Sequence, residues 1–302
     1  MKSNLRDSDN SNKTTREKTG KYHKIYEQIL ENPLISNYDI AAITGLSRNT
    51  VSKYLGEMYA NSIMTGPFLQ MKSASNYKEY VYLMNFSDPS RAFDRLKEFP
   101  HTVYTAFTFG DWNTMVITNQ LLNFSELANF ESMVHQSVKY CSYTPRTEYL
   151  TWYESFERVY EKLYQFTPGW TEYKNRELTY LDWGENEWKL FCAFNFMRKK
   201  ATPVLRSIEM YYEVYAKWMK TLEDHCTIHT GFYPQGYQNY VVLCFLFYTD
   251  YEESVKYVFS QFPTTSLIME LEKSLLVFVH VMSSDVRLGL MCLIYDMEKK
   301  KM

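Results

Sequence analysis

The chain has 302 residues, 45% of them hydrophobic, and a formal net charge of −2 at pH 7. This length is sufficient for two or three domains with buried cores. The nearly neutral charge excludes a polycation, so any contact with nucleic acid must be confined to part of the surface. Aromatic residues make up 17% of the chain, including 27 tyrosines, and tyrosine suits half-buried sheet surfaces and interfaces because it combines an apolar ring with a hydroxyl.

The sequence predicts neither a membrane span nor an export signal. Its longest apolar run, YVVLCFLFY at 240–248, is strand-sized and shorter than the ~18–20 apolar residues that cross a bilayer. The first 18 residues lack the apolar core of a signal peptide, and we expect residues 1–20 to form a disordered polar arm. The five cysteines are scattered and form no CxxC motif, which favours a reducing, cytoplasmic location.

Residues 21–72 have the pattern of a winged helix-turn-helix. A first helix, with apolar residues at helical spacing from Tyr22, ends at Asn32-Pro33 because proline cannot continue a helix. Ser36 or Asn37 caps a short second helix, and Gly45 ends it because glycine adopts a left-handed conformation at little cost. A third helix follows Ser47, and the extended stretch 63–71 supplies the wing.

The third helix, SRNTVSKYL and its continuation, separates apolar from polar residues. Val51, Leu55 and Met58 form the expected buried stripe, together with Tyr54. Arginine and asparagine bind purine edges, whereas serine, threonine and lysine bind phosphates. The residues expected to contact DNA are Ser47, Arg48, Asn49, Thr50, Ser52 and Lys53. The alternative is that these residues are simply the solvated face of a small helical domain.

Residues 73–146 predict a βαββαβ unit. The expected elements are strands at 80–86, 103–109, 112–118 and 137–143 and helices at 88–99 and 125–133, with a Gly110-Asp111 turn between the second and third strands. This order gives an antiparallel sheet with helices on one face, an α+β, ferredoxin-like arrangement.

The segment Asn32–Met64 resembles the DNA-binding domain of the Lrp/AsnC family of prokaryotic regulators, and the unit after it resembles that family's ligand-sensing RAM domain. The resemblance implies a transcriptional regulator of double-stranded DNA that is a homodimer through its sheet domains and binds a small effector near the turn between the second and third strands. Tyr104, Gly110, Asp111 and Trp112 are the expected effector-binding residues. The family habit implies an amino acid, although another small organic molecule fits equally, and the aromatic residues could instead be sheet core.

The second half repeats this plan as a tandem duplication. YVYLMNFSD at 80–88 recurs as YVVLCFLFYTD at 240–250, and EFPHT at 98–102 recurs as QFPTT at 261–265. We therefore expect a linker helix within 147–182, a second winged helix-turn-helix at 183–235 with its wing strand near 225–229, and a second ferredoxin-like domain at 236–302 whose fourth strand is short or missing.

The second helix-turn-helix is degenerate at the positions that matter for DNA. Glu209 replaces Gly45, and Tyr211-Tyr212-Glu213 replaces Ser47-Arg48-Asn49. Because a glutamate repels phosphate, we expect this copy not to bind DNA. Each chain would then have one helix able to bind DNA. Two chains would be needed to bind a two-fold symmetric DNA site.

Two further sequence patterns bear on catalysis and on metal binding, and a ligand sensor or adaptor that does not bind DNA is a further alternative to the regulator. Sirohaem decarboxylases of tetrapyrrole metabolism resemble this chain in tandem architecture, and His101 and Tyr104 match part of their histidine-tyrosine-arginine constellation, but the nearby arginine is absent. His225, Cys226 and His229 are closely spaced, yet no second ligand pair lies at a spacing typical of zinc sites. We therefore expect no enzymatic activity, no cofactor and no metal.

Overall fold

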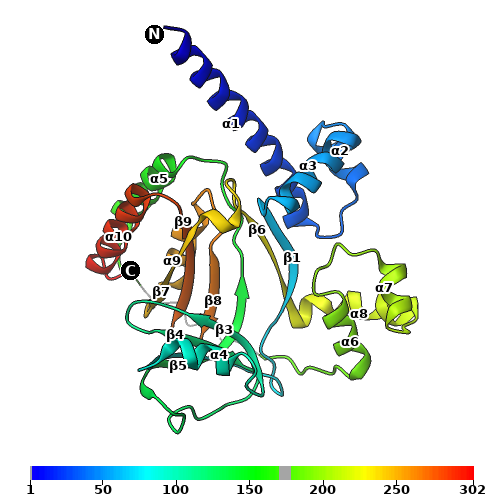
Figure 1. Ribbon diagram of the computed structural model, residues 1–302, viewed down its shortest axis with the longest axis vertical. Coiled ribbons are helices and arrows are strands. Elements are labelled where there is room, and N and C mark those ends of the chain that lie inside the picture. Colours follow the sequence, from blue (N-terminus) through cyan, green and yellow to red (C-terminus); the bar gives the residue numbers. More distant parts are fainter. Residues whose placement is uncertain (1, 170–177) are drawn as a thin grey trace.

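The computed structural model describes residues 2–169 and 178–302. Two helix-turn-helix domains lie on one side of the molecule and the sheet domains on the other, with strands β1 and β6 between them (Figure 1). The elements of the first half are α1 (Lys2–Glu31), α2 (Asn37–Thr44), α3 (Arg48–Ala60), β1 (Met64–Met71), β2 (Glu79–Phe86), α4 (Pro89–Leu96), β3 (Thr102–Phe107), β4 (Thr114–Thr118) and β5 (Phe130–Tyr143). Those of the second half are α5 (Trp152–Gln165), α6 (Glu185–Ala193), α7 (Ala201–Ser207), α8 (Tyr212–His225), β6 (Cys226–Phe232), the 3₁₀ turn η1 (Tyr237–Asn239), β7 (Val241–Phe247), α9 (Glu252–Ser260), β8 (Leu267–Leu271), β9 (Leu275–Val281) and α10 (Ser284–Lys299).

The first helix-turn-helix forms as its capping residues predict. The Ser36 hydroxyl accepts from the amide of Asp39 and begins α2, and Gly45 ends it with a left-handed φ of 70°. Val51, Leu55 and Met58 of α3 are buried with Tyr22, Ile25 and other apolar residues of α1.

The N-terminal arm differs from the expectation of disorder. Helix α1 begins at Lys2 and continues unbroken to Glu31. Residues 2–19 contain no proline or glycine that would interrupt a helix, and an ion pair between Lys21 and Glu17, one turn apart, supports it.

The wings of the two helix-turn-helix domains pair with each other. Strand β1 runs antiparallel to β6, with Leu69 opposite Ile228 and Met71 opposite Cys226. The crossing is close because a Cβ atom on Gly66 would lie 2.1 Å from the carbonyl oxygen of His229. The sequence predicted a wing strand in each half of the chain. It did not predict that the two wing strands would pair with each other.

The second helix-turn-helix keeps the three helices without the residues that favour their boundaries. Glu209 adopts a left-handed φ of 53° at the position where the first copy has Gly45. Tyr211 is the N-cap of α8 but makes no side-chain capping bond. The domain is held by a core of aromatic residues instead, including Phe194, Tyr215 and Trp218.

The first sheet unit has the expected strands but lacks one expected helix. Strand β5 begins at Phe130, so the helix predicted at 125–133 is wrong. The segment before β5 turns instead: the Asn123 side chain accepts from the Ser125 amide, and Asn129 has a left-handed φ of 68°. Such local side-chain bonds compete with helix formation.

The second sheet unit ends differently from the first. Its strands β7, β8 and β9 and helix α9 repeat β2, β3, β4 and α4, and α10 follows β9. No strand follows α10 among the residues described, in agreement with the expectation that the fourth strand is short or missing.

The two units join into one seven-stranded sheet in the order β3-β4-β2-β5-β8-β9-β7, with β5 antiparallel to β8. The sheet folds on itself, since Val81 and Met115 of the first unit share a buried cluster with Met269 and Leu276 of the second. The chain thus pairs its two sheet domains internally.

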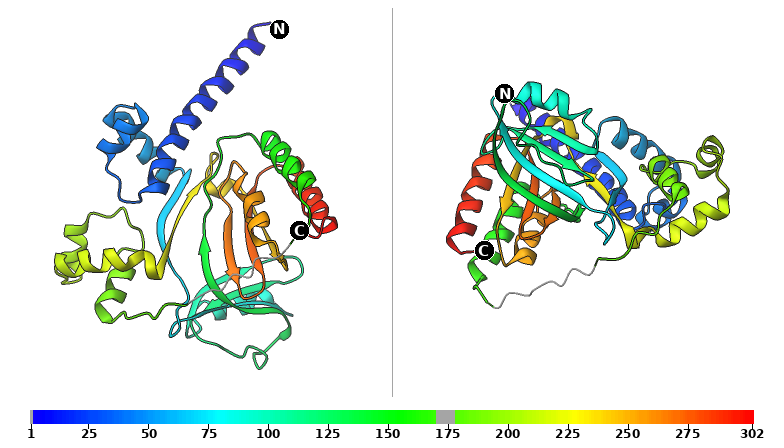
Figure 2. Two further views of the ribbon diagram at one scale, coloured as in Figure 1. Left: turned by 180° about the vertical axis from the view of Figure 1, so that it is seen from behind. Right: turned by 90° about the horizontal axis from the view of Figure 1, so that it is seen from below.

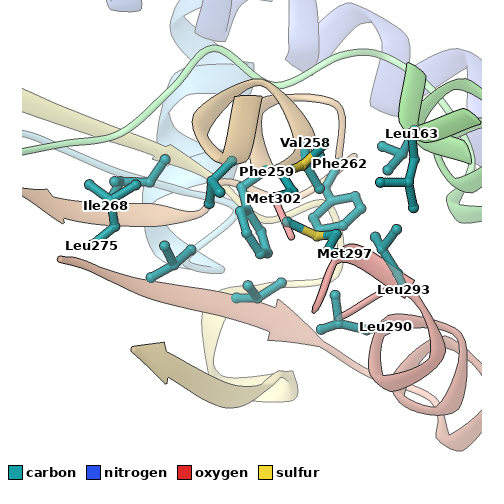
Figure 3. Close-up of a cluster of buried hydrophobic side chains, with 14 of the residues drawn as sticks. Leu163, Val258, Phe259, Phe262, Ile268, Leu275, Leu290, Leu293, Met297 and Met302 are labelled. Atoms are coloured by element: carbon teal, nitrogen blue, oxygen red, sulfur yellow. The ribbon is translucent and has the colours of Figure 1, made fainter. Parts of the chain in front are cut away.

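Helices cover the outer face of the second unit. Val159 and Leu163 of α5 pack with α9 and α10 over β8 and β9 (Figure 3), and α5 lies beside α10 on the side away from the helix-turn-helix domains (Figure 2). The linker helix expected within 147–182 is α5, and residues 170–177 of that range lie outside the described residues.

We expect Gly66→Ala to lower the free energy of unfolding by at least ~1–2 kcal/mol. Glycine at this position has a φ of 77° and no room for a Cβ atom, and other residues are strained in this conformation. Chemical denaturation measures the effect. The control is Gly56→Ala at an exposed position of α3, where nothing lies within 4 Å of an added Cβ atom, and this change should be neutral or stabilising. Equal destabilisation by both changes would contradict the close wing crossing.

Candidate nucleic-acid interface and effector pocket

The third helix presents the predicted polar residues to solvent. The Ser47 hydroxyl accepts from the amide of Thr50 and fixes the start of α3. Arg48, Asn49, Ser52 and Lys53 are exposed. These donors therefore lie on the face opposite the buried stripe, as a helix that enters a DNA groove requires.

Most of these side chains have internal partners that orient them. Asn37 donates to the hydroxyl of Ser52 at 3.1 Å, and the Ser47 and Thr50 hydroxyls lie 2.8 Å apart. Lys53 lies 3.9 Å from Glu57 in an exposed pair. Within the described part of the chain, no hydrogen bond or ion pair engages the side chains of Arg48 and Asn49, so both are available to a ligand.

The second helix-turn-helix contacts the first through Arg198. This side chain donates to the carbonyl oxygens of Pro33 and Ile35 at 3.1 and 2.9 Å. It also lies 3.4 Å from the Asn37 side-chain oxygen. Because Asn37 in turn donates to Ser52 on α3, Arg198 orients the start of α2 and, through it, the recognition helix.

The corresponding face of α8 has different chemistry. Tyr211 and Tyr212 are 78% and 64% exposed, and Glu213 is exposed beside them. This face offers aromatic rings and a carboxylate where α3 offers an arginine and an asparagine.

A pocket of about 1180 Å³ lies between the seven-stranded sheet and the paired wings. Its walls come from β3, β7, β8 and β9 and from wing strands β1 and β6. All four residues expected to bind an effector, Tyr104, Gly110, Asp111 and Trp112, line it. The lining is mostly aromatic and apolar with a few polar groups, as in small-molecule sites.

The polar groups of the pocket are largely buried. Lys139 and Glu79 form an ion pair with both side chains buried. The His229 ring nitrogen Nε2 lies 2.7 Å from the carbonyl oxygen of Ser142, and Nδ1 of His280 lies 2.9 Å from that of Thr265. Since a carbonyl only accepts, these nitrogens bear the protons, and the other ring nitrogen of each histidine is an acceptor.

Burial keeps both imidazoles neutral. It lowers the pKa of His229 to about 4 and that of His280 to about 4, against the partial opposing effect of the backbone hydrogen bonds. Sequence reasoning did not identify either residue as part of the pocket. The sequence around each histidine gives little indication of a pocket, because His229 lies in the segment HCTIH and His280 lies within an apolar strand.

The structure separates the residues considered for metal binding and catalysis. His225 ends α8 and lies 3.6 Å from Asp182, whereas His229 faces Ser142. Among residues 2–169 and 178–302, no group of three or more candidate metal ligands is found. His101 is exposed with a left-handed φ of 67° and does not line the pocket with Tyr104.

Comparison with known proteins identifies the first domain. Residues 23–61 match the family described as winged helix-turn-helix DNA-binding. This range contains α2, α3 and most of the buried part of α1, so the N-terminal domain of the chain is a winged helix-turn-helix. No curated protein matches the chain.

Three solved structures show what the chain is similar to. AsnC of E. coli is 12% identical, with 39% of this chain and 89% of AsnC covered, at a TM-score of 0.33. A transcriptional regulator from Neisseria meningitidis, solved in complex with L-Met, is 12% identical over 39% of this chain and 86% of its own, at 0.32. The sirohaem decarboxylase NirDL is 12% identical over 93% of this chain and 87% of its own, at 0.47. Within the described residues, no helix is long and apolar enough to cross a membrane.

We expect the free energy of unfolding to fall as the pH decreases from about 6.5 to 4. The folded-state pKa values of His229 and His280 lie below the unfolded value, so the unfolded chain binds more protons in this range. Each histidine contributes a slope of at most ~1.4 kcal/mol per pH unit, and above about pH 6.5 its contribution to stability is constant. Urea denaturation at a series of pH values measures this.

His280→Gln should reduce the slope by removing one of the histidines whose pKa is lowered by burial. His101→Gln, at an exposed position, is the matched control. An unchanged slope in His280→Gln would show that this histidine is not held neutral in the folded protein.

Proposed function

We propose that this protein is a sequence-specific, DNA-binding transcriptional regulator that responds to a small-molecule effector and acts as a homodimer in the cytoplasm. The main support is the recognition helix α3: its capped start, its buried stripe and its exposed Arg48 and Asn49. Arg48 and Asn49 would contact base edges, and Ser47, Thr50, Ser52 and Lys53 would contact phosphates.

The effector would occupy the pocket beneath the wings. Strands β1 and β6 contribute Phe68, Gln70, His229 and Gly231 to its wall. Since β1 follows α3 after a short turn and β6 follows α8 directly, a molecule that contacts these strands can shift the helix-turn-helix domains relative to the sheet units. Binding would change DNA affinity to the extent that the effector prefers one of the two arrangements.

The pocket lining indicates the chemistry of the effector. Aromatic walls that include Tyr104, Trp112 and Tyr233 fit an apolar or planar body. The neutral imidazoles of His229 and His280 and the exposed Asp111 offer a small number of polar contacts. We propose a small organic molecule with an apolar body and one polar end, a class that includes the larger apolar amino acids.

We expect Arg48→Ala to abolish sequence-specific binding, because a bidentate base contact contributes ~1–3 kcal/mol of discrimination. The matched control is Tyr212→Ala, at the corresponding exposed position of the second helix-turn-helix. It should leave binding intact. A mobility-shift assay with the DNA upstream of the protein's own gene, at several salt concentrations, measures both.

Equal effects of the two substitutions would contradict an assignment of DNA binding to the first domain alone. A complete lack of salt-dependent binding by the wild type, together with a bound tetrapyrrole chromophore after purification, would instead favour a sirohaem decarboxylase-like enzyme.

We expect Arg198→Lys to weaken specific DNA binding about 10-fold, equivalent to ~1.4 kcal/mol. Lysine keeps the charge, but it cannot reproduce the fork of contacts to Pro33, Ile35 and Asn37. The control is Arg206→Lys, an exposed arginine in the same domain, and both are assayed by fluorescence anisotropy. Unchanged affinity in Arg198→Lys would show that the second domain does not orient the recognition helix.

A further inference from the structure

The sheet has an unoccupied edge at β7. In the first unit the central strand β2 lies between β4 and β5. Its counterpart in the second unit, β7, pairs with β9 on one side, and no described strand pairs with its other side. The internal repeat therefore defines a place for one more strand beside β7, equivalent to the place of β5 beside β2.

The residues around this place are apolar and exposed. On β7 itself, Val241 is 50% and Val242 42% exposed. On the opposite edge strand β3, Val103 and Phe107 are also exposed, and these residues line one continuous opening with Val241 and Val242.

Helix α10 adds a second apolar surface beside the edge. Leu288, Met291 and Tyr295 are exposed and lie three and four residues apart, so they form one stripe along the helix. Met291 lines the same opening as Val241 and Phe245 of β7. The exposed stripe on α10, the exposed valines of β7 and the unpaired edge of β7 therefore adjoin the position that one additional strand would occupy.

The β7 edge also lacks the usual protection against pairing. Natural edge strands contain charges, prolines or bulges that prevent association with other chains. The run at 240–248, YVVLCFLFY, contains neither a charged residue nor a proline, and β7 pairs with β9 in an unbroken register. Its continuous apolar sequence is typical of a strand that is covered on both faces.

We infer that the β7 strand of a second copy of this chain occupies this place, pairing antiparallel with β7 about a two-fold axis. Such an interface is isologous, because each copy's β7 supplies the strand that the other lacks. The α10 stripes flank it, and the pairing would close the pocket along this side. The geometry does not depend on DNA, although the role of the dimer, two recognition helices for one two-fold site, rests on the proposed function.

Charge at the strand ends is compatible with this pairing. Antiparallel strands bring the end of one β7, followed by Asp250, Glu252 and Glu253, beside the start of the other. The start is preceded by the uncharged segment Tyr237–Asn239, so no like charges meet. A copy of the same chain therefore fits the edge without repulsion.

Two single substitutions test the interface by sedimentation velocity without DNA. Val242→Lys places a charge on the edge strand β7, and Leu288→Glu places one on the α10 stripe. Each introduces like charges across a two-fold axis at a site that is exposed in one chain. We expect the wild type to be a dimer at micromolar concentration and each variant to dissociate at least 10-fold more readily.

The matched control is Leu121→Lys, at a residue 61% exposed in the first sheet unit, which should remain dimeric. Circular dichroism verifies that each variant folds. If Val242→Lys fails to fold, the oligomeric state of Leu288→Glu alone tests the interface. A monomeric wild type, or a folded Leu288→Glu as dimeric as the wild type, would overturn the inference. A monomeric wild type that forms a stable complex with a different, extended peptide would also overturn it.

DNA binding is measured separately on a half-site and a full two-fold site. If dimerisation behaves as expected but neither DNA is bound, the proposed function fails and the interface stands. If both sites are bound and charge at Val242 and Leu288 leaves the dimer unchanged, the interface fails and the proposed function stands.

Discussion

The antiparallel pairing of β1 with β6 is the contact on which the rest of the structure depends. It joins residues 64–71 to residues 226–232, more than half the chain apart in sequence. Each wing leaves its own helix-turn-helix to reach the other, so neither domain is complete within its half of the chain. The pairing also forms the wall of the pocket that faces the helix-turn-helix domains. A change of wing position would therefore alter the contacts of the DNA-binding domain and those of a bound effector together.

The internal pairing of the sheet domains likewise joins the two halves of the chain. Strand β5 extends past β2 to reach β8, and the cluster that contains Val81 and Leu276 is buried only because both units contribute. Closing such long loops costs conformational entropy that grows slowly with length, whereas the burial of apolar surface grows with the area of contact. A duplicated chain can therefore form within one molecule the contacts that separate chains would otherwise form between subunits.

Local features were predictable from sequence because they depend on few residues. Ser36 and Ser47 act as N-caps and Gly45 as a left-handed stop as expected, since each needs only its neighbours along the chain. The partner of a wing was not predictable, because an eight-residue strand pattern specifies which face is buried but not which strand it meets. The pocket residues His229 and His280 were missed for this reason, since each lines the pocket only through long-range pairing.

The two helix-turn-helix domains show how the duplication separates folding from recognition. Glu209 in a left-handed conformation costs ~1–2 kcal/mol relative to glycine, and the absence of a capping bond at Tyr211 costs ~1 kcal/mol more. The second domain offsets these losses with the core around Phe194, Tyr215 and Trp218. It lacks the donors of a recognition helix, and residues between its helices α6 and α7 hold the first domain instead: the Asn195 carbonyl accepts from the Leu69 amide of β1, and Arg198 donates to the loop before α2. The same fold therefore presents a surface to DNA in one copy and orients that surface in the other.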